Sequence, residues 1–92
     1  MRIVGYIEDK PCKITVFHQG LRFMVKFEDG LYEQSYKFRE SAQINNLKDI
    51  LKLIDDDFIN EVMIRFTEMR KSTGSLLERF IGETLMDEEE II

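Results

Sequence analysis

The sequence predicts an α+β fold: a four-stranded antiparallel meander followed by two or three helices packed on one face of the sheet. Two observations support this prediction. Residues 2–38 hold four runs in which apolar and polar side chains alternate, separated by short turns that contain Gly or Pro. Residues 45–86 instead carry apolar side chains at helical spacing. Because the turns are too short for a crossover connection, neighbouring strands must run antiparallel.

The four expected strands cover residues 2–8, 12–18, 21–28 and 31–38. Pro11, Gly20 and the pair Asp29-Gly30 mark the turns between them. Alternation along the strands then assigns each side chain to one of two faces. The expected core face holds Ile3, Gly5, Ile7, Ile14, Val16, Leu21, Phe23, Val25, Phe27, Tyr32, Tyr36 and Phe38.

The helical half is expected to begin at Asn45 or Asn46, which are good N-cap residues. An apolar stripe then runs from Leu47 to Met69, and one helix over residues 46–71 is compatible with it. Such a helix is longer than the strands, and Asp55, Asp56 and Asp57 disfavour a helix interior, so we expect a break there. The alternative of a single helix stays open.

The sequence Lys-Ser-Thr-Gly-Ser at residues 71–75 predicts a loop. Ser75 and Glu78 match a capping box, so a short helix over residues 76–86 is expected after it. Residues 87–92 are expected to form an acidic, frayed tail.

Composition fits one domain over residues 1–92. Of the 92 residues, 43% are hydrophobic and 34% are charged, which is typical of a soluble globular protein. A chain this short has a thin core, so its seven Phe and five Met favour self-association. The single cysteine excludes an intramolecular disulfide, and no signal peptide or membrane span is recognised, so we expect a reduced, cytoplasmic compartment.

Charge is distributed unevenly. The net charge is −5, which is unusual for a non-specific nucleic-acid coat protein. Residues 1–40 have a net charge of +1, however, with seven Lys or Arg against six Asp or Glu. Residues 41–92 have a net charge of −6, with six against twelve. The acidity therefore belongs to the C-terminal half.

The second sheet face mixes cations with large apolar side chains. Its members are Arg2, Val4, Tyr6, Lys13, Thr15, Phe17, Arg22, Met24, Lys26, Glu33, Ser35 and Lys37. Cations beside aromatic side chains are what single-stranded nucleic acid requires. Exposed aromatics also mark protein interfaces, and cations on strands can simply be solvated. The candidate nucleic-acid or partner-binding residues are Tyr6, Lys13, Phe17, Arg22, Met24 and Lys26.

On this pattern the chain resembles the Whirly and Pur-alpha group of single-stranded-DNA-binding domains, whose unit is four strands followed by a helix. The resemblance covers residues 2–66. It implies dimerisation through the helix and nucleic-acid binding on the sheet, with Lys13, Phe17, Arg22 and Lys26 as possible contacts. The acidic net charge and the additional C-terminal helix depart from that group.

No residue set favours catalysis. His18 and Cys12 are six residues apart on one strand, hence about 20 Å apart, and His18 is expected to be solvated at a turn. Asp55, Asp56, Asp57 and Glu61 lack the spacing of a calcium loop, and a helix cap explains the aspartates. Residues 71–75 lack the order of a phosphate loop. We expect no enzyme activity, no metal and no cofactor.

The function expected from the sequence is therefore that of a small, homodimeric protein-interaction domain. Its motivation is a surplus of large apolar residues on the helices, and the candidate interface residues are Ile59, Met63, Leu77, Phe80 and Ile81. The alternative is a single-stranded nucleic-acid-binding module that uses the second sheet face.

Overall fold

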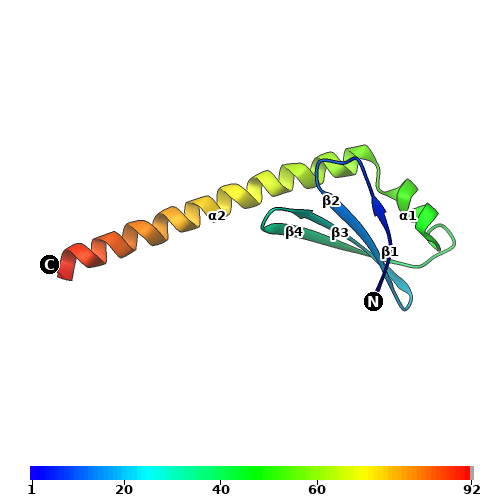
Figure 1. Ribbon diagram of the computed structural model, residues 1–92, viewed down its shortest axis with the longest axis horizontal. Helices are drawn as coiled ribbons and strands as arrows, with labels where there is room; N and C mark the ends of the chain where they lie inside the picture. The colour runs from blue at the N-terminus through cyan, green and yellow to red at the C-terminus, as the bar shows by residue number, and fades with distance from the viewer. Residues whose placement is uncertain (92) are drawn as a thin grey trace.

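The computed structural model describes the backbone of residues 1–91 and the side chains of residues 1–83. Four strands form one antiparallel sheet in chain order: β1 (Arg2–Ile7), β2 (Lys13–Gln19), β3 (Arg22–Asp29) and β4 (Tyr32–Arg39). Two helices follow, α1 (Leu47–Leu53) and α2 (Asp56–Ile91). Both helices cover the same face of the sheet, called the inner face below (Figure 1). The predicted α+β meander is confirmed.

Two tight hairpins hold β2, β3 and β4 together. Each has a Gly-Leu pair between its strands, Gly20-Leu21 and Gly30-Leu31. Gly20 has φ 59° and Gly30 has φ 62°. A positive φ at the first turn residue is the requirement of a type II′ hairpin turn, and glycine meets it without strain. Both turns were predicted, but Leu21 was wrongly assigned to the core: it lies in a turn and is 73% exposed.

A β-bulge in β1 changes which side chains face the core. Ile3 pairs with Phe17 and Gly5 pairs with Val16, so Val4 is the extra residue. Val4 packs against the core, while Ile3 is 51% exposed and belongs to the outer face. The predicted positions of Ile3 and Val4 were therefore wrong. Strict alternation cannot detect a one-residue insertion in the ladder.

The core lies between the inner face and the two helices. The sheet and both helices contribute buried side chains to it: Ile14, Val16, Phe23, Val25 and Phe27 from the sheet, Ile50 and Ile54 from or next to α1, and Ile59, Val62 and Phe66 from α2. Phe58 adds edge-to-face ring contacts with Phe27 and Tyr36. α1 sits closely on β1, because a Cβ on Gly5 would lie 2.8 Å from Leu47 Cδ2.

The helices begin where the sequence predicts. Asn46 Oδ1 accepts a hydrogen bond from Asp49 N at 2.9 Å and caps α1. Asp55 Oδ1 accepts one from Phe58 N at 2.9 Å, directly before α2. The expected break at the three aspartates is thus confirmed. Asp56 also pairs with Lys10 Nζ at 2.9 Å, which links the start of α2 to the β1–β2 connection.

The expected loop at residues 71–75 was wrong, because α2 is continuous from Asp56 to Ile91. The separate helix over 76–86 is the continuation of α2, and Ser75 is inside the helix rather than a cap. Ser, Thr and Gly weaken a helix without forbidding it, and no proline interrupts this stretch. Residues 87–91 of the expected tail lie in α2 as well, whereas the side chains of the tail are outside the described residues.

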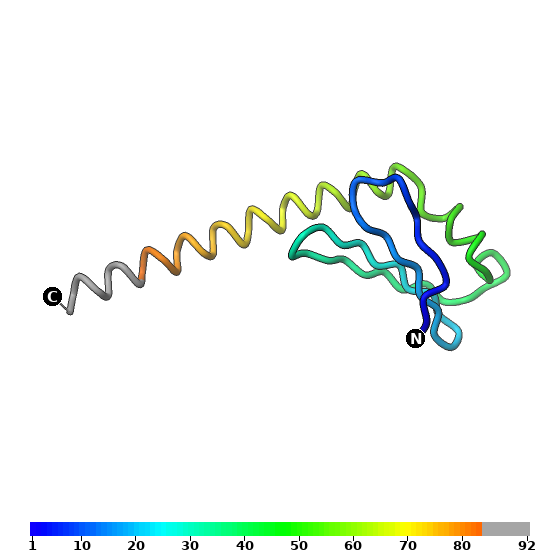
Figure 2. Tube along the Cα trace, viewed as in Figure 1, coloured from blue at the N-terminus to red at the C-terminus, as the bar shows by residue number. Residues whose placement is uncertain are grey.

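Helix α2 crosses the inner face and continues past the β3–β4 turn (Figures 1 and 2). Arg70 Nη1 lies 3.0 Å from Asp29 Oδ2 where the helix leaves the sheet. Residues 71–91, called the overhang below, extend about 30 Å further at 1.5 Å per residue. The chain consequently measures 66 × 26 × 18 Å.

Candidate functional site

The outer face of the sheet is not covered by either helix, and the strand pairing arranges its side chains in rows. One row is Ile3, Phe17, Met24 and Lys37. The next is Tyr6, Thr15, Lys26 and Ser35. Directly paired residues share a face and stand about 5 Å apart. The register therefore brings the predicted Phe17 and Met24 side by side, with Tyr6 in the neighbouring row.

Two of the predicted cations have acidic neighbours. Lys26 Nζ lies 3.3 Å from Glu33 Oε2. Lys13 is paired across the strands with Glu28. The bulge in β1 moves Arg2 away from the outer face. Arg2 is paired with His18, and His18 faces the inner side. These three positions add little net positive charge to the outer face.

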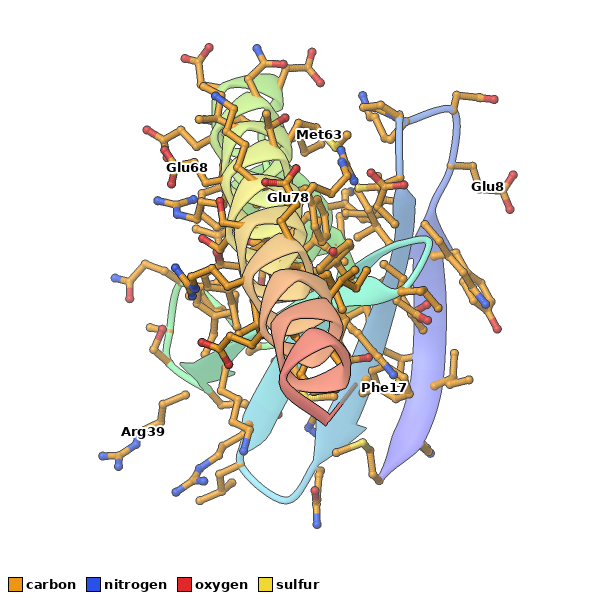
Figure 3. All side chains as sticks on the ribbon, turned by 90° about the vertical axis from the view of Figure 1, so that its left-hand side faces the viewer. Glu8, Phe17, Arg39, Met63, Glu68 and Glu78 are labelled. Carbon is orange, nitrogen blue, oxygen red and sulfur yellow. The ribbon has the colours of Figure 1, made fainter. Side chains whose placement is uncertain are left out.

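The remaining cations gather at the end of the sheet where β3 begins and β4 ends. Arg22 is paired directly with Arg39, and Lys37 is two residues before Arg39 on the same strand. Among the described residues, no ion pair involves Arg22, Lys37 or Arg39. Arg39 projects away from α2 (Figure 3). Arg22 and Arg39 also line a depression of about 470 Å³ beside the β2–β3 turn.

Arg39 and Ile3 were missed from the sequence. The fourth strand was expected to end at Phe38, but β4 extends to Arg39. Because side chains alternate along a strand, Arg39 lies on the same face as Lys37. For Ile3 the sequence offers no comparable signal, since the bulge depends on pairing with β2. Like charges placed directly opposite each other destabilise a sheet, so the Arg22–Arg39 pair is a local conflict that an anion would relieve.

The apolar part of the outer face is partly covered by its own side chains. Phe17 and Met24 are half-buried, whereas Tyr6 is 51% exposed. Thr15 is only 3% exposed although it faces away from the helices, because its cross-strand neighbours are Tyr6 and Lys26. The side chains around Thr15 therefore fill this part of the outer face.

The overhang is the second candidate surface. Leu76, Leu77, Phe80 and Ile81 are each more than half exposed there. Together with Val62, Phe66, Met69 and the partly buried Thr73, they recur at spacings of three and four residues, so they continue the helix face that packs on the sheet. Glu78 and Glu68 project from other sides of α2 (Figure 3). The apolar face of α2 that is buried in the core therefore continues, uncovered by the sheet, along the overhang.

The predicted interface residues do not all lie on this surface. Ile59 is 2% exposed and belongs to the core, so its assignment to an interface was wrong. Met63 is half-buried against the core. Leu77, Phe80 and Ile81 are on the overhang, and Leu76 joins them. In the sequence, the buried residues and the exposed residues belong to one helical stripe. The sheet is shorter than α2, so it covers the first group and leaves the second exposed.

A groove of about 720 Å³ runs between β4 and α2, and three of its polar side chains donate hydrogen bonds. Gln34 Nε2 donates to Val62 O at 2.9 Å, and Tyr36 Oη donates to Gln34 Oε1 at 2.7 Å. Thr73 Oγ1 donates to Met69 O at 3.0 Å on the helix wall. The Gln34 bond joins α2 to the edge strand β4, whereas the other two bonds stay within β4 and within α2.

His18 is half-buried rather than solvated, which corrects the expectation from its place near a turn. Its Nε2 lies 2.7 Å from Glu40 Oε1, and its ring stands 4.7 Å from that of Phe23. Cys12 precedes β2 and His18 is near the other end of that strand, so they form no pair. Burial raises the pKa of the Cys12 thiol, and the negative charge of Asp29 raises it further. Such a thiol is a poor nucleophile.

Within the described part of the chain, no group of three His, Cys, Asp or Glu side chains could hold a metal ion. The same residues include no helix that is both long and apolar enough to span a bilayer. In comparisons with protein-family models, curated proteins and solved structures, nothing matched the chain.

Proposed function

We propose that this protein is a non-catalytic interaction domain of the cytoplasm that assembles as a homodimer through the overhang of α2. The observation that carries the proposal is the exposure of Leu76, Leu77, Phe80 and Ile81, which is 52–65% on one helix face. Contiguous exposed apolar side chains on a small domain mark an interaction site. The same stripe is buried by the sheet at Val62 and Phe66.

The stability of the helix supports the same proposal. Near its start the overhang holds four weak helix formers, Ser72, Thr73, Gly74 and Ser75. Most of the stability of a helix in a protein comes from tertiary packing of its apolar face, which this segment lacks in the monomer. A partner that packs on the apolar stripe would bury its leucines, phenylalanine and isoleucine, and this packing would also stabilise the helix.

Sedimentation equilibrium tests the proposal with a matched pair of variants. Leu77→Ser with Ile81→Ser removes apolar area from the stripe and should weaken the dimer at least tenfold. Ile64→Ser is the control, because Ile64 is 59% exposed on the side of α2 away from the stripe. A wild-type protein that stays monomeric at high micromolar concentration would refute the dimer, as would equal weakening by the Ile64 control.

A second candidate function is single-stranded nucleic-acid binding on the outer face, and the specific observation in its favour is the Arg22–Arg39 pair with Lys37 beside it. This cluster adjoins the row of Phe17 and Met24, so phosphates and bases would each find a suitable contact. The resemblance to the Whirly and Pur-alpha group supports the same use of the sheet.

Fluorescence anisotropy with labelled oligonucleotides at low and moderate salt tests this candidate. Binding should be strongest at low salt, and its absence there ends the idea. Arg22→Gln with Arg39→Gln should weaken binding and reduce its salt dependence. Lys48→Gln, an exposed position on α1, is the control and should have a smaller effect.

A further inference from the structure

We propose that the two overhangs pair antiparallel, side by side along residues 71–91, with a two-fold axis near Ile81 and the two sheets at opposite ends. The proposal rests on the homodimer proposed above and gives it a geometry. The occupant of the exposed stripe is a second copy of this chain.

The layer structure excludes the parallel alternative. Each sheet covers the apolar face of its own α2 as far as Arg70, which contacts Asp29 at 3.0 Å. In a parallel pair, both sheets would stand between the two helices at the same end. Packed layers lie about 10 Å apart, so the helices would be held about 30 Å apart beside the sheets. They would have to approach to about 8–10 Å at the overhangs, which one continuous helix cannot do over a few turns.

The antiparallel pair avoids this conflict. Each overhang continues past the β3–β4 turn (Figure 1). Its stripe is in helical phase with Val62 and Phe66, which are buried by the sheet, so it faces the same side as the sheet. The partner's overhang can therefore occupy the layer that the sheet occupies further back. Its length of about 30 Å fills the space up to the β3–β4 turn of the other copy. Leu76, Leu77, Phe80 and Ile81 would then form the centre of the interface.

Charge along the overhang supports the same orientation. Lys71 lies at its beginning, and the sequence of its last turns is Asp87-Glu88-Glu89-Glu90. An antiparallel pair with an axis near Ile81 brings the acidic end of one copy to the basic start of the other. A parallel pair would place the two acidic ends together, where like charges repel.

Distances between spin labels test the orientation, with Asn60 and Glu78 as label sites after replacement by Cys. Both are exposed, and they are 18 residues, or five helical turns, apart on the same side of α2. The antiparallel pair predicts about 20–30 Å between labels at Glu78 and about 60 Å or more between labels at Asn60. A parallel pair predicts no separation of about 60 Å at Asn60, because both sheets and both Asn60 labels would then lie at the same end of the dimer.

Cys12 is replaced by Ala for these measurements, with circular dichroism as the check on folding. A second set retains Cys12, whose buried thiol should label slowly, so the result does not depend on one background. A dimer with a short Asn60 distance, or a long Glu78 distance, overturns the antiparallel pairing and leaves the homodimer standing. A monomer overturns both.

Charge reversal gives an independent test. Lys71→Glu should weaken the dimer about two- to fivefold, the range of one exposed ion pair. Glu88→Lys with Glu89→Lys in the same chain should restore the affinity, because the two ends that meet in an antiparallel pair would again carry opposite charges. Failure of this rescue in a dimer that still depends on Leu77 contradicts the antiparallel contact.

Discussion

Arg70 Nη1 and Asp29 Oδ2 lie 3.0 Å apart and join α2 to the end of β3. The pair is partly solvated, with Arg70 45% and Asp29 32% exposed. Such pairs contribute about 0–1 kcal/mol. Asp29→Asn should therefore lower the free energy of unfolding by less than about 1 kcal/mol, and less at high salt. Urea unfolding at low and high salt measures it, and a larger loss at high salt would contradict an electrostatic role.

The same carboxylate contributes to the raised pKa of Cys12, after burial of the thiol. Asp29→Asn should consequently lower the pKa of the Cys12 thiol, but not to that of a free cysteine, because burial remains. The pH dependence of iodoacetamide alkylation measures this pKa. A pKa that stays unchanged in the variant would show that Asp29 does not act on the thiol.

Cys12 also gives stability a pH dependence with a definite sign. A thiol whose pKa is higher in the folded state contributes stability that is complete below the unfolded pKa of about 8.5 and is lost as pH rises above it. Wild-type protein should therefore lose more stability between pH 8 and pH 10 than Cys12→Ala does. Urea unfolding at both pH values tests the difference, and identical losses would contradict the expected sign.

Two glycine substitutions should have opposite effects. A Cβ at Gly74 meets nothing within 4 Å, so Gly74→Ala should strengthen α2 by about 1 kcal/mol. Gly30 has φ 62°, and Gly30→Ala should destabilise the protein by about 1–2 kcal/mol. Hydrogen exchange in residues 71–81 and thermal unfolding measure the two effects. Weaker protection in Gly74→Ala would contradict a continuous helix there.

Phe66 and Phe80 belong to one stripe but should respond differently to truncation. Phe66 is fully buried, so Phe66→Ala should lower the free energy of unfolding by about 3–5 kcal/mol. Phe80 is 65% exposed, so Phe80→Ala should change the stability of the monomer little and weaken the dimer. Unfolding and sedimentation of both variants over a range of concentrations separate these effects. A large loss of monomer stability in Phe80→Ala would place Phe80 in the core.

Local chemistry made much of this molecule predictable from its sequence. Period-2 alternation and two Gly-containing turns define the meander, and Asn46 and the Asp55–Asp57 triplet define where helices begin. These features depend on residues within a few positions of one another. Phe17, Arg22 and Met24 were placed on the outer face for the same reason, because alternation holds along a regular strand.

Long-range packing decided the rest. The bulge at Val4 exists only through pairing with β2, and it exchanged Ile3 and Val4 between the two faces. The Arg22–Arg39 and His18–Glu40 pairs join positions 17 and 22 residues apart, which no local pattern reports. In the sequence, Ile59 and Ile81 are both isoleucines in the same apolar stripe of α2. The sheet ends between them, and that tertiary boundary alone makes one residue core and the other surface.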